Sequence, residues 1–224
     1  MKKQGRFWLG CLLISVGLSM YAINVSAQTV SWEIVKHSTD INTLKGEVTE
    51  YTNQGYVPVG ITYDNVELYI LYVQVEGLEI EAWWLGWYDD RDTIQKGITD
   101  KMNEGYVPTG ITYTGDKFYV LYVKTKSSAT AWQLVPSALN LNAVKQAIQP
   151  YIDQGYVPTG ISKYGKEYWT LLLETPDTSI TKWKIETYVV GKHGDEINAN
   201  IEQGYVPWGL EYRGKQIDIL YVGF

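Results

Sequence analysis

One heptapeptide recurs four times in this sequence and organises everything around it. The copies are Gly55-Tyr-Val-Pro-Val-Gly-Ile61, Gly105-Tyr-Val-Pro-Thr-Gly-Ile111, Gly155-Tyr-Val-Pro-Thr-Gly-Ile161 and Gly204-Tyr-Val-Pro-Trp-Gly-Leu210. Their first glycines are residues 55, 105, 155 and 204, so the steps are 50, 50 and 49 residues. A near-identical segment at one fixed period is the signature of a tandem repeat. The recurring positions are Gly55, Tyr56, Pro58 and Gly60; Gly105, Tyr106, Pro108 and Gly110; Gly155, Tyr156, Pro158 and Gly160; and Gly204, Tyr205, Pro207 and Gly209.

A helix is predicted directly upstream of each first glycine. Mostly apolar residues precede that glycine at intervals of four, which places them on one helical stripe. They are Leu44, Val48 and Thr52; Ile94, Ile98 and Met102; Val144, Ile148 and Ile152; and His193, Ile197 and Ile201. Asp40, Asp92 and Asn140 are the predicted N-caps. The glycine then ends the helix in a left-handed backbone conformation, and the following proline prevents the helix from continuing.

A β-hairpin is predicted downstream of each heptapeptide. The pairs Asp64-Asn65, Thr114-Gly115, Tyr164-Gly165 and Arg213-Gly214 suit two-residue turns that need a positive φ. Another strand is predicted before each helix, starting at Trp32, Trp83, Trp132 and Trp183. The predicted fold class is therefore α+β, with four β-α-β-β repeats, antiparallel sheets, and helices packed on one face. The predicted segments are a signal peptide at 1–27 and repeats at 28–77, 78–127, 128–178 and 179–224.

The strand after each hairpin predicts how the repeats assemble. One face carries Leu71, Leu121, Leu171 and Leu220, and the other carries Tyr72, Tyr122, Leu172 and Tyr221. Both faces are apolar, so both should be covered, whereas one helix covers only one. A unit of this size also has too small a core to be stable alone. We expect the repeats to stack or pair into one body, and favour a closed ring less because a helix interrupts each copy.

The N-terminus predicts export. Lys2, Lys3 and Arg6 precede an apolar run from Phe7 to Ile23, and Val25-Ser26-Ala27 resembles a signal-peptidase site. An uncleaved anchor is the alternative. A lipid-attachment role for Cys11 is rejected because the apolar segment continues past it. We expect a bacterial protein, periplasmic or extracellular, with no membrane span after cleavage.

Charge disfavours nucleic acid as a partner. Removing three basic residues leaves 19 − 3 = 16 Lys and Arg against 25 Asp and Glu, a net charge of 16 − 25 = −9. An acidic chain repels phosphate backbones.

No motif for enzymatic or metal chemistry emerges, and we expect neither an enzyme nor a cofactor. The two histidines, His37 and His193, are not at metal-ligand spacing, and we expect His193 to be a satisfied interior residue. Ser179 and Lys182 fit Ser-x-x-Lys, but Ser179 lies in a linker leading into a strand, whereas that chemistry needs the serine at the start of a buried helix. A carboxylate pair for glycoside hydrolysis stays open, since many acids are present.

Aromatic residues are the candidate binding residues. The chain has 19 Tyr and 9 Trp but 3 Phe, and exposed rings form platforms for sugars or protein anchors. Residues that break the repeat pattern are the candidates, because the motif itself is explained by backbone needs. They are Trp84, Trp87, Trp169 and Trp208. Packing between repeats is the alternative role for them.

A helix followed by Gly-Tyr-x-Pro and a hairpin ending in a Tyr-rich strand resembles bacterial tandem-repeat domains attached to polyglycine-hydrolase-like serine enzymes. The resemblance rests on Gly55-Tyr56-Val57-Pro58, on Tyr69-Ile-Leu-Tyr-Val73 and on their counterparts. Those repeats more often have a basic residue in place of Val57, and the hydrolase domain has no counterpart here. The resemblance implies an accessory recognition module and transfers no site residues.

The expected function is a non-enzymatic exported binding module for a protein or a glycan. A structural subunit that self-associates as a homo-oligomer or within an envelope complex is the first alternative. A hydrolase of unknown type is the second.

Overall fold

The computed structural model describes residues 30–126, 129–176 and 179–224. The predicted signal peptide therefore lies outside the described residues. The order strand, helix, strand, strand occurs four times, and we number these units 1 to 4. Unit 1 contains β1 (Val30–His37), α1 (Ile41–Asn53), β2 (Val57–Tyr63) and β3 (Leu68–Val75); unit 2 contains β4 (Ala82–Tyr88), α2 (Arg91–Asn103), β5 (Tyr106–Tyr113) and β6 (Phe118–Lys124). Unit 3 contains β7 (Ala131–Ala138), α3 (Leu141–Ile152), β8 (Tyr156–Tyr164) and β9 (Glu167–Glu174); unit 4 contains β10 (Lys182–Val189), α4 (Gly194–Glu202), β11 (Val206–Arg213) and β12 (Gln216–Gly223).

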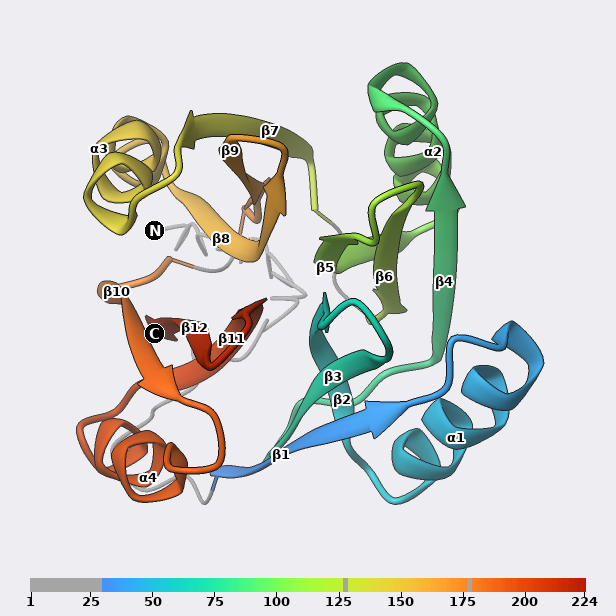
Figure 1. Cartoon of the computed structure of the whole chain (residues 1–224), viewed down its shortest axis with the longest axis horizontal. Helices are drawn as coiled ribbons and strands as arrows, with labels where there is room; N and C mark the ends of the chain where they lie inside the picture. Colours follow the sequence, from blue (N-terminus) through green and yellow to red (C-terminus); the bar gives the residue numbers. More distant parts are fainter. Residues whose placement is uncertain (1–29, 127–128, 177–178) are drawn as a thin grey trace, which may run out of the picture.

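Each unit forms one three-stranded antiparallel sheet with its last strand in the middle. The orders are β1-β3-β2, β4-β6-β5, β7-β9-β8 and β10-β12-β11. The second strand of each unit lies toward the centre of the molecule, and the first strand lies toward its periphery (Figure 1). We call β2, β5, β8 and β11 the inner strands, and β1, β4, β7 and β10 the outer strands.

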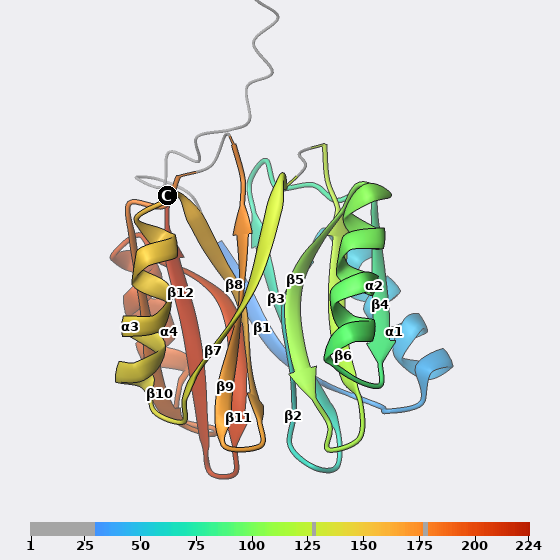
Figure 2. The ribbon, with the colours of Figure 1, turned by 90° about the horizontal axis from the view of Figure 1, so that it is seen from above.

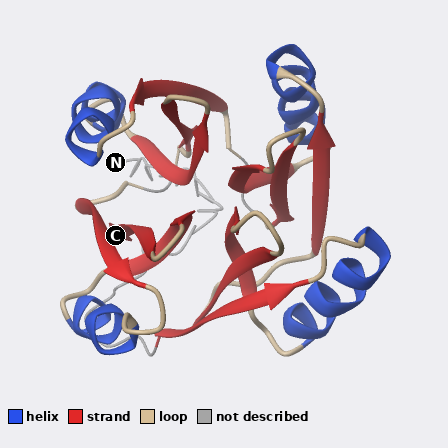
Figure 3. Ribbon diagram, viewed as in Figure 1, coloured by secondary structure: helices blue, strands red, loops and turns tan. Residues whose placement is uncertain are grey.

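The inner strands form a closed ring. β2 contacts β5, β5 contacts β8, β8 contacts β11, and β11 contacts β2 again. The sequence favoured a stack or a pair over this ring because of the helix in each unit. The helices lie at the periphery (Figure 3), outside the strands that meet at the centre, so they do not obstruct closure. In the side view the four hairpins point to the same end of the ring (Figure 2).

Closure covers both apolar faces of every middle strand. On β3, Tyr72 packs in one cluster with Leu44 and Val48 of α1. Leu71 on the opposite face packs in another cluster with Ile197 of α4, in unit 4. Each middle strand is thus covered by its own unit on one side and by the preceding unit on the other, as the two apolar faces predicted. An open stack would leave one such face uncovered, whereas the ring leaves none.

Tryptophans of the outer strands bond to the helix of the preceding unit. The Trp132 Nε1–H donates to Thr99 Oγ1 of α2 at 3.3 Å, and Trp183 Nε1–H donates to Gln149 Oε1 of α3 at 3.2 Å. Trp32 Nε1–H makes the same kind of bond to Asn198 Oδ1 of α4 at 2.9 Å, across 166 positions of sequence. The contact between units 4 and 1, which closes the ring, therefore uses the same kind of hydrogen bond as the contacts between units that follow each other in the chain.

The second glycine of each heptapeptide lies at the centre of the ring. A Cβ built on Gly110 would lie 3.0 Å from the Cα of Gly60, and one on Gly60 would lie 3.1 Å from the Cα of Gly209. Gly160 approaches Gly110 in the same way at 3.2 Å, and Gly209 approaches Gly160 at 3.5 Å. We call these four glycines the hub. At Gly60, Gly110 and Gly160 the inner strands meet so closely that a larger residue would push the backbones apart, whereas a Cβ on Gly209 would make ordinary van der Waals contact.

The first glycine of each heptapeptide has the left-handed conformation that the sequence predicts. The φ angles of Gly55, Gly105, Gly155 and Gly204 are 87°, 85°, 94° and 78°. The predicted hairpins also have one positive φ each, at Asn65, Gly115, Gly165 and Gly214.

All four hairpins have two-residue turns, one residue later than predicted. The strand registers leave such turns at 165–166 and 214–215. In units 1 and 2 the backbone N–H groups of Asp64 and Thr114 donate to the carbonyls of Glu67 and Lys117 at 3.2 and 2.9 Å, which leaves 65–66 and 115–116 as the turns. The Asp64 carboxylate also accepts hydrogen bonds from the backbone N–H groups of Val66 and Glu67, both at 2.8 Å, which stabilises the first turn.

The helix starts agree with two of the three predicted caps. The side chains of Asp40 and Asn140 accept a hydrogen bond from the backbone N–H three residues further on, as N-caps do. Asp92 is not a cap. α2 begins at Arg91, so Asp90 is the N-cap, and its capping box with Thr93 satisfies the first backbone donors.

Candidate binding surface on an outer strand

The outer strands differ most at two register positions. The first lies opposite Tyr72, Tyr122, Leu172 and Tyr221 of the middle strands, and is filled by Glu33, Trp84, Gln133 and Lys184. The second lies opposite Tyr69, Tyr119, Trp169 and Asp218, and is filled by Lys36, Trp87, Pro136 and Thr187. Unit 2 thus has tryptophan where the other units have polar residues or proline. Trp84 is 37% exposed and Trp87 is 45% exposed.

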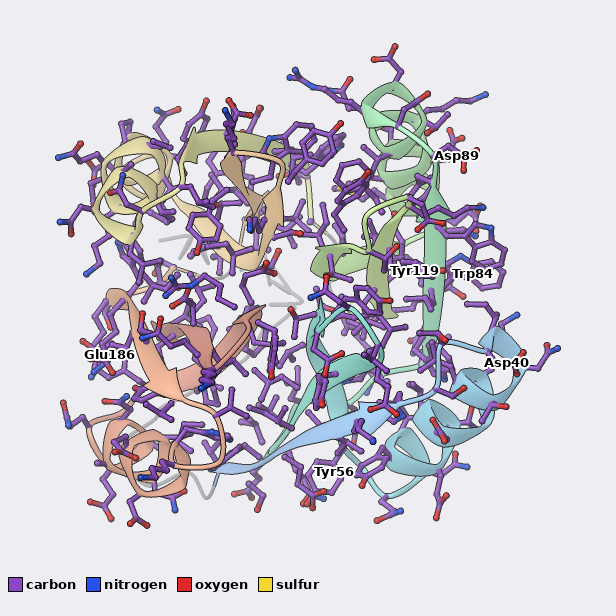
Figure 4. All side chains as sticks on the ribbon, viewed as in Figure 1. Asp40, Tyr56, Trp84, Asp89, Tyr119 and Glu186 are labelled. Atoms are coloured by element: carbon purple, nitrogen blue, oxygen red, sulfur yellow. The ribbon has the colours of Figure 1, made fainter. Side chains whose placement is uncertain are left out.

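Trp84 lies between two lysines from different units. Its ring centre is 4.5 Å from Lys101 Nζ of α2 and 5.6 Å from Lys45 Nζ of α1. Lys101 also pairs with Glu104 at 2.6 Å. Figure 4 shows Trp84 pointing away from the centre of the ring, on the outer side of β4. The surface around this ring combines an apolar plane with ammonium groups, which suits an anionic or a hydrogen-bonding partner.

Trp84 and Trp87 lie on opposite faces of β4. The register of β4 against β6 is continuous from Ala82 to Tyr88, so side chains alternate between faces along it. Residues three positions apart therefore point to opposite sides. The two rings flank one strand edge, and they do not form a single flat platform.

The other two candidate tryptophans are not on this surface. Trp169 is on the middle strand β9, is 5% exposed, and stacks on Phe118 at 5.5 Å between ring centres. Trp208 lies at a β-bulge of β11, packs edge-on against Phe224 at 5.9 Å, and has a buried Nε1 with no partner among the described residues. The sequence grouped four tryptophans, but the structure places two of them in packed interfaces between units.

The tyrosines of the heptapeptide lie beside the ends of the helices. The Tyr56 hydroxyl donates to Glu33 at 3.2 Å, and Tyr156 packs edge-on against Tyr151 at 5.8 Å. Tyr205 lies under the ammonium groups of Lys182 and Lys184, at 4.3 and 4.5 Å. Their contacts are within their own units, which fits the structural role expected for the motif.

A buried acid at the ring closure was missed by the sequence reasoning. Glu211 of β11 is 5% exposed, and it accepts the backbone N–H of Lys163 at 3.0 Å and the Thr62 hydroxyl at 3.3 Å. Burial raises the pKa of its carboxyl to about 8, and the charge of Asp218 acts in the same direction. The signal was available: Thr62, Thr112 and Ser162 hold this position in the other units.

The histidines have structural surroundings. His37 is buried, with Nδ1 2.9 Å from Glu47 and Nε2 2.9 Å from the Tyr72 hydroxyl. The expectation of a satisfied His193 is wrong, since it precedes α4 and its Nδ1 has no partner among the described residues. Within the parts of the chain that the structure describes, no three His, Cys, Asp or Glu residues gather into a metal-binding group.

Among the residues that the structure describes, no contact joins Ser179 to Lys182 as a catalytic pair would require. Lys182 begins β10, where its ammonium group donates to the backbone carbonyl of Gln203 and lies over Tyr205. Ser179 lies in the linker before that strand.

Among residues 30–126, 129–176 and 179–224, no helix has the length and apolar character needed to cross a membrane. No protein-family model matches the chain, and no curated protein matches it.

Proposed function

We propose that this chain is an exported, non-enzymatic bacterial binding module. Its ring of four units is the scaffold, and the outer strand β4 with Trp84 and Trp87 is the surface that contacts a protein or a glycan. The protein acts outside the cytoplasm, after removal of the N-terminal segment.

One observation carries this proposal. Four outer strands share one architecture, and three of them have Glu33 and Lys36, Gln133 and Pro136, or Lys184 and Thr187 at the two variable positions. Unit 2 has two half-exposed tryptophans there. These rings leave a large part of their apolar surface in water, and tryptophan is among the residues most enriched at binding hot spots. The other three units serve as internal references for what the fold alone requires.

Self-association is the second candidate function, and one observation favours it. β4 lies at the end of its sheet and has neither a charged residue nor a proline. Such an edge is open to pairing with another strand. A hydrolase stays a third possibility without any described constellation in its favour.

The experiment transplants the residues of unit 1 onto unit 2. The native chain and the variant Trp84→Glu/Trp87→Lys are screened on glycan and protein arrays. We expect the variant to lose at least about tenfold in affinity, the scale of one hot-spot residue. The matched control is Glu33→Ala/Lys36→Ala at the same two positions of unit 1, which should bind like the native chain. Equal binding by the transplant variant and the native chain would show that β4 is not the contact surface.

A further inference from the structure

The edge of β4 is unprotected, unlike the other outer edges. Soluble proteins keep sheet edges from pairing with charged residues or proline. β1 has Glu33 and Lys36, β7 has Pro136, and β10 has Lys182, Lys184 and Glu186. β4 reads Ala-Trp-Trp-Leu-Gly-Trp-Tyr. Three edges are therefore blocked by the usual means, and one is left open.

The two tryptophans fit a strand better than a sugar. A sugar ring stacks on a flat aromatic face, and two rings cooperate when they share that face. Trp84 and Trp87 lie on opposite faces of β4. A strand added to this edge would instead receive an aromatic ring over each of its two faces.

The register indicates which way the backbone N–H of Trp87 points. In unit 3 the same register position is Pro136, opposite Trp169. Proline has no N–H, and edge strands accept it where the N–H would face away from the sheet. At this position the N–H of Trp87 therefore points outward, toward any strand that pairs with β4.

We propose that β4 pairs antiparallel with β4 of a second copy of this chain. The inference rests on the proposed function, because it uses the same surface and names its partner. Two identical antiparallel strands are related by a two-fold axis perpendicular to the sheet, so equivalent side chains share a face. With Gly86 near the axis, both copies' Trp84 rings cover one face of the joint and both Trp87 rings cover the other. The two three-stranded sheets become one continuous sheet.

Charges at the two ends of β4 suit this antiparallel arrangement. Lys45 is exposed beside Trp84, toward the beginning of the strand. Asp89 follows the strand at its other end (Figure 4), and its side chain is 78% exposed although Oδ1 is 3.6 Å from Lys117 Nζ. Antiparallel pairing brings Lys45 of one copy near Asp89 of the other, at both ends of the joint. Two copies of an acidic chain repel each other overall, and these two contacts oppose that repulsion where the copies meet.

The first experiment measures mass in solution over a range of concentrations by light scattering or sedimentation. The chain is expressed with its own N-terminal segment, so that export sets its start. We expect a dimer. Trp87→Pro, the residue of unit 3, should abolish the dimer at every concentration because it removes the outward donor. Trp87→Thr, the residue of unit 4, keeps that donor and should only weaken the dimer. Both residues occur at this position in other units, and the unfolding midpoint confirms that each variant folds.

The second experiment tests the direction of pairing by charge reversal. Lys45→Glu and Asp89→Lys should each weaken the dimer about fivefold, the scale of an exposed ion pair. The double variant restores opposite charges across the joint and should recover native affinity. Lys145→Glu changes the unit 3 counterpart of Lys45 and should have no effect.

The outcomes separate this inference from the proposed function. A monomer at all concentrations, or equal effects of Trp87→Pro and Trp87→Thr, overturns strand pairing between copies. If that monomer still binds a protein or glycan through Trp84 and Trp87, the proposed function stands with another partner. If it binds nothing through them, both proposals fail.

Discussion

The hub and the outer strands of this ring obey different constraints. At the hub, glycine recurs in all four units, and at Gly60, Gly110 and Gly160 a Cβ would lie only 2.9 to 3.1 Å from the nearest backbone atom of a neighbouring unit. At the two exposed outer positions, no residue recurs in a second unit. Closure thus dictates identity at the centre and leaves the outward-facing positions free to differ. Function is then expected where units differ without a packing reason, as they do at Trp84 and Trp87.

One buried position of the inner strands differs in a single unit, and it gives the largest expected change in stability. Thr62, Thr112 and Ser162 occupy one position of the inner strands, and Glu211 occupies it in unit 4. The backbone N–H of Tyr212 donates to the Thr62 hydroxyl at 2.8 Å, and that of Tyr113 donates to Ser162 at 3.0 Å. Glu211 makes the corresponding bond with Lys163 of the preceding unit. A carboxyl therefore accepts the bond that a hydroxyl accepts in other units, although its buried position disfavours a charged carboxylate.

We predict that this carboxyl makes stability fall as pH rises. The pKa of Glu211 is raised from 4.5 to about 8 by burial, so the folded state keeps a proton that the unfolded state has released. Its stabilising contribution is complete below about pH 4.5 and is lost as pH rises to about 8, by at most about 5 kcal/mol. Glu211→Gln keeps an acceptor for Lys163 but does not ionise. Denaturant unfolding at about pH 5 and pH 8 should show stability falling with pH in the native chain and not in the variant.

His37 provides the check on this interpretation. Burial lowers its pKa, so its contribution is lost as pH falls below about 6.5, in the opposite direction. The Gln variant retains His37, and the difference between the two curves isolates Glu211. Parallel curves for the native chain and the variant would mean that Glu211 ionises normally in the fold.

Substitution at the hub gives the next largest change in stability, and the four glycines leave different amounts of space for a Cβ. A Cβ on Gly110 would lie 2.9 Å from the backbone nitrogen of Ile61, whereas one on Gly209 finds nothing nearer than 3.5 Å. Gly110→Ala should cost about 3 kcal/mol of unfolding free energy, because backbone must move to accept the methyl group. Gly209→Ala should cost less than about 1 kcal/mol. Equal costs would contradict the geometry of the hub.

The order of elements could be predicted because its signals are local. A left-handed glycine, a following proline and strand alternation act within a few residues, so helix ends and hairpins were found. Closure was not predictable in the same way. It depends on α4 covering Leu71 and on Asn198 accepting from Trp32, and neither contact leaves a signal in the neighbouring sequence. The choice of Asp92 over Asp90 as a cap reflects the usual uncertainty of helix ends.

The candidate site was half predictable for a related reason. Trp84 and Trp87 were identified because they differ from the other copies, and they are exposed. Trp169 also differs from its counterparts, but Phe118 of the preceding unit covers it. Difference between copies marks a residue as special, and only the assembled ring decides whether it faces solvent or a neighbour. The same comparison would have revealed Glu211.

The smallest expected change in stability concerns outer-strand residues whose side chains bond to the middle strand. At these positions the outer-strand residue and its middle-strand partner change together from unit to unit. The buried hydroxyls of Tyr72, Tyr122 and Tyr221 bond to His37, Tyr88 and Tyr188 at 2.9, 2.9 and 3.0 Å. Unit 3 has Leu172 in place of the tyrosine, and Ser137 in place of its partner.

Ser137 should therefore be dispensable. Its buried Oγ has no hydrogen-bond partner among the described residues, so Ser137→Ala removes an unsatisfied group and should stabilise the fold by about 0.5–1 kcal/mol. Tyr88→Phe in unit 2 is the matched control, since it strands the Tyr122 hydroxyl and should destabilise by about 1 kcal/mol. Denaturant unfolding measures both. A loss of stability in Ser137→Ala would show that the serine hydroxyl stabilises the fold. It would contradict the view that residues at this position matter only through their bond to the middle-strand tyrosine.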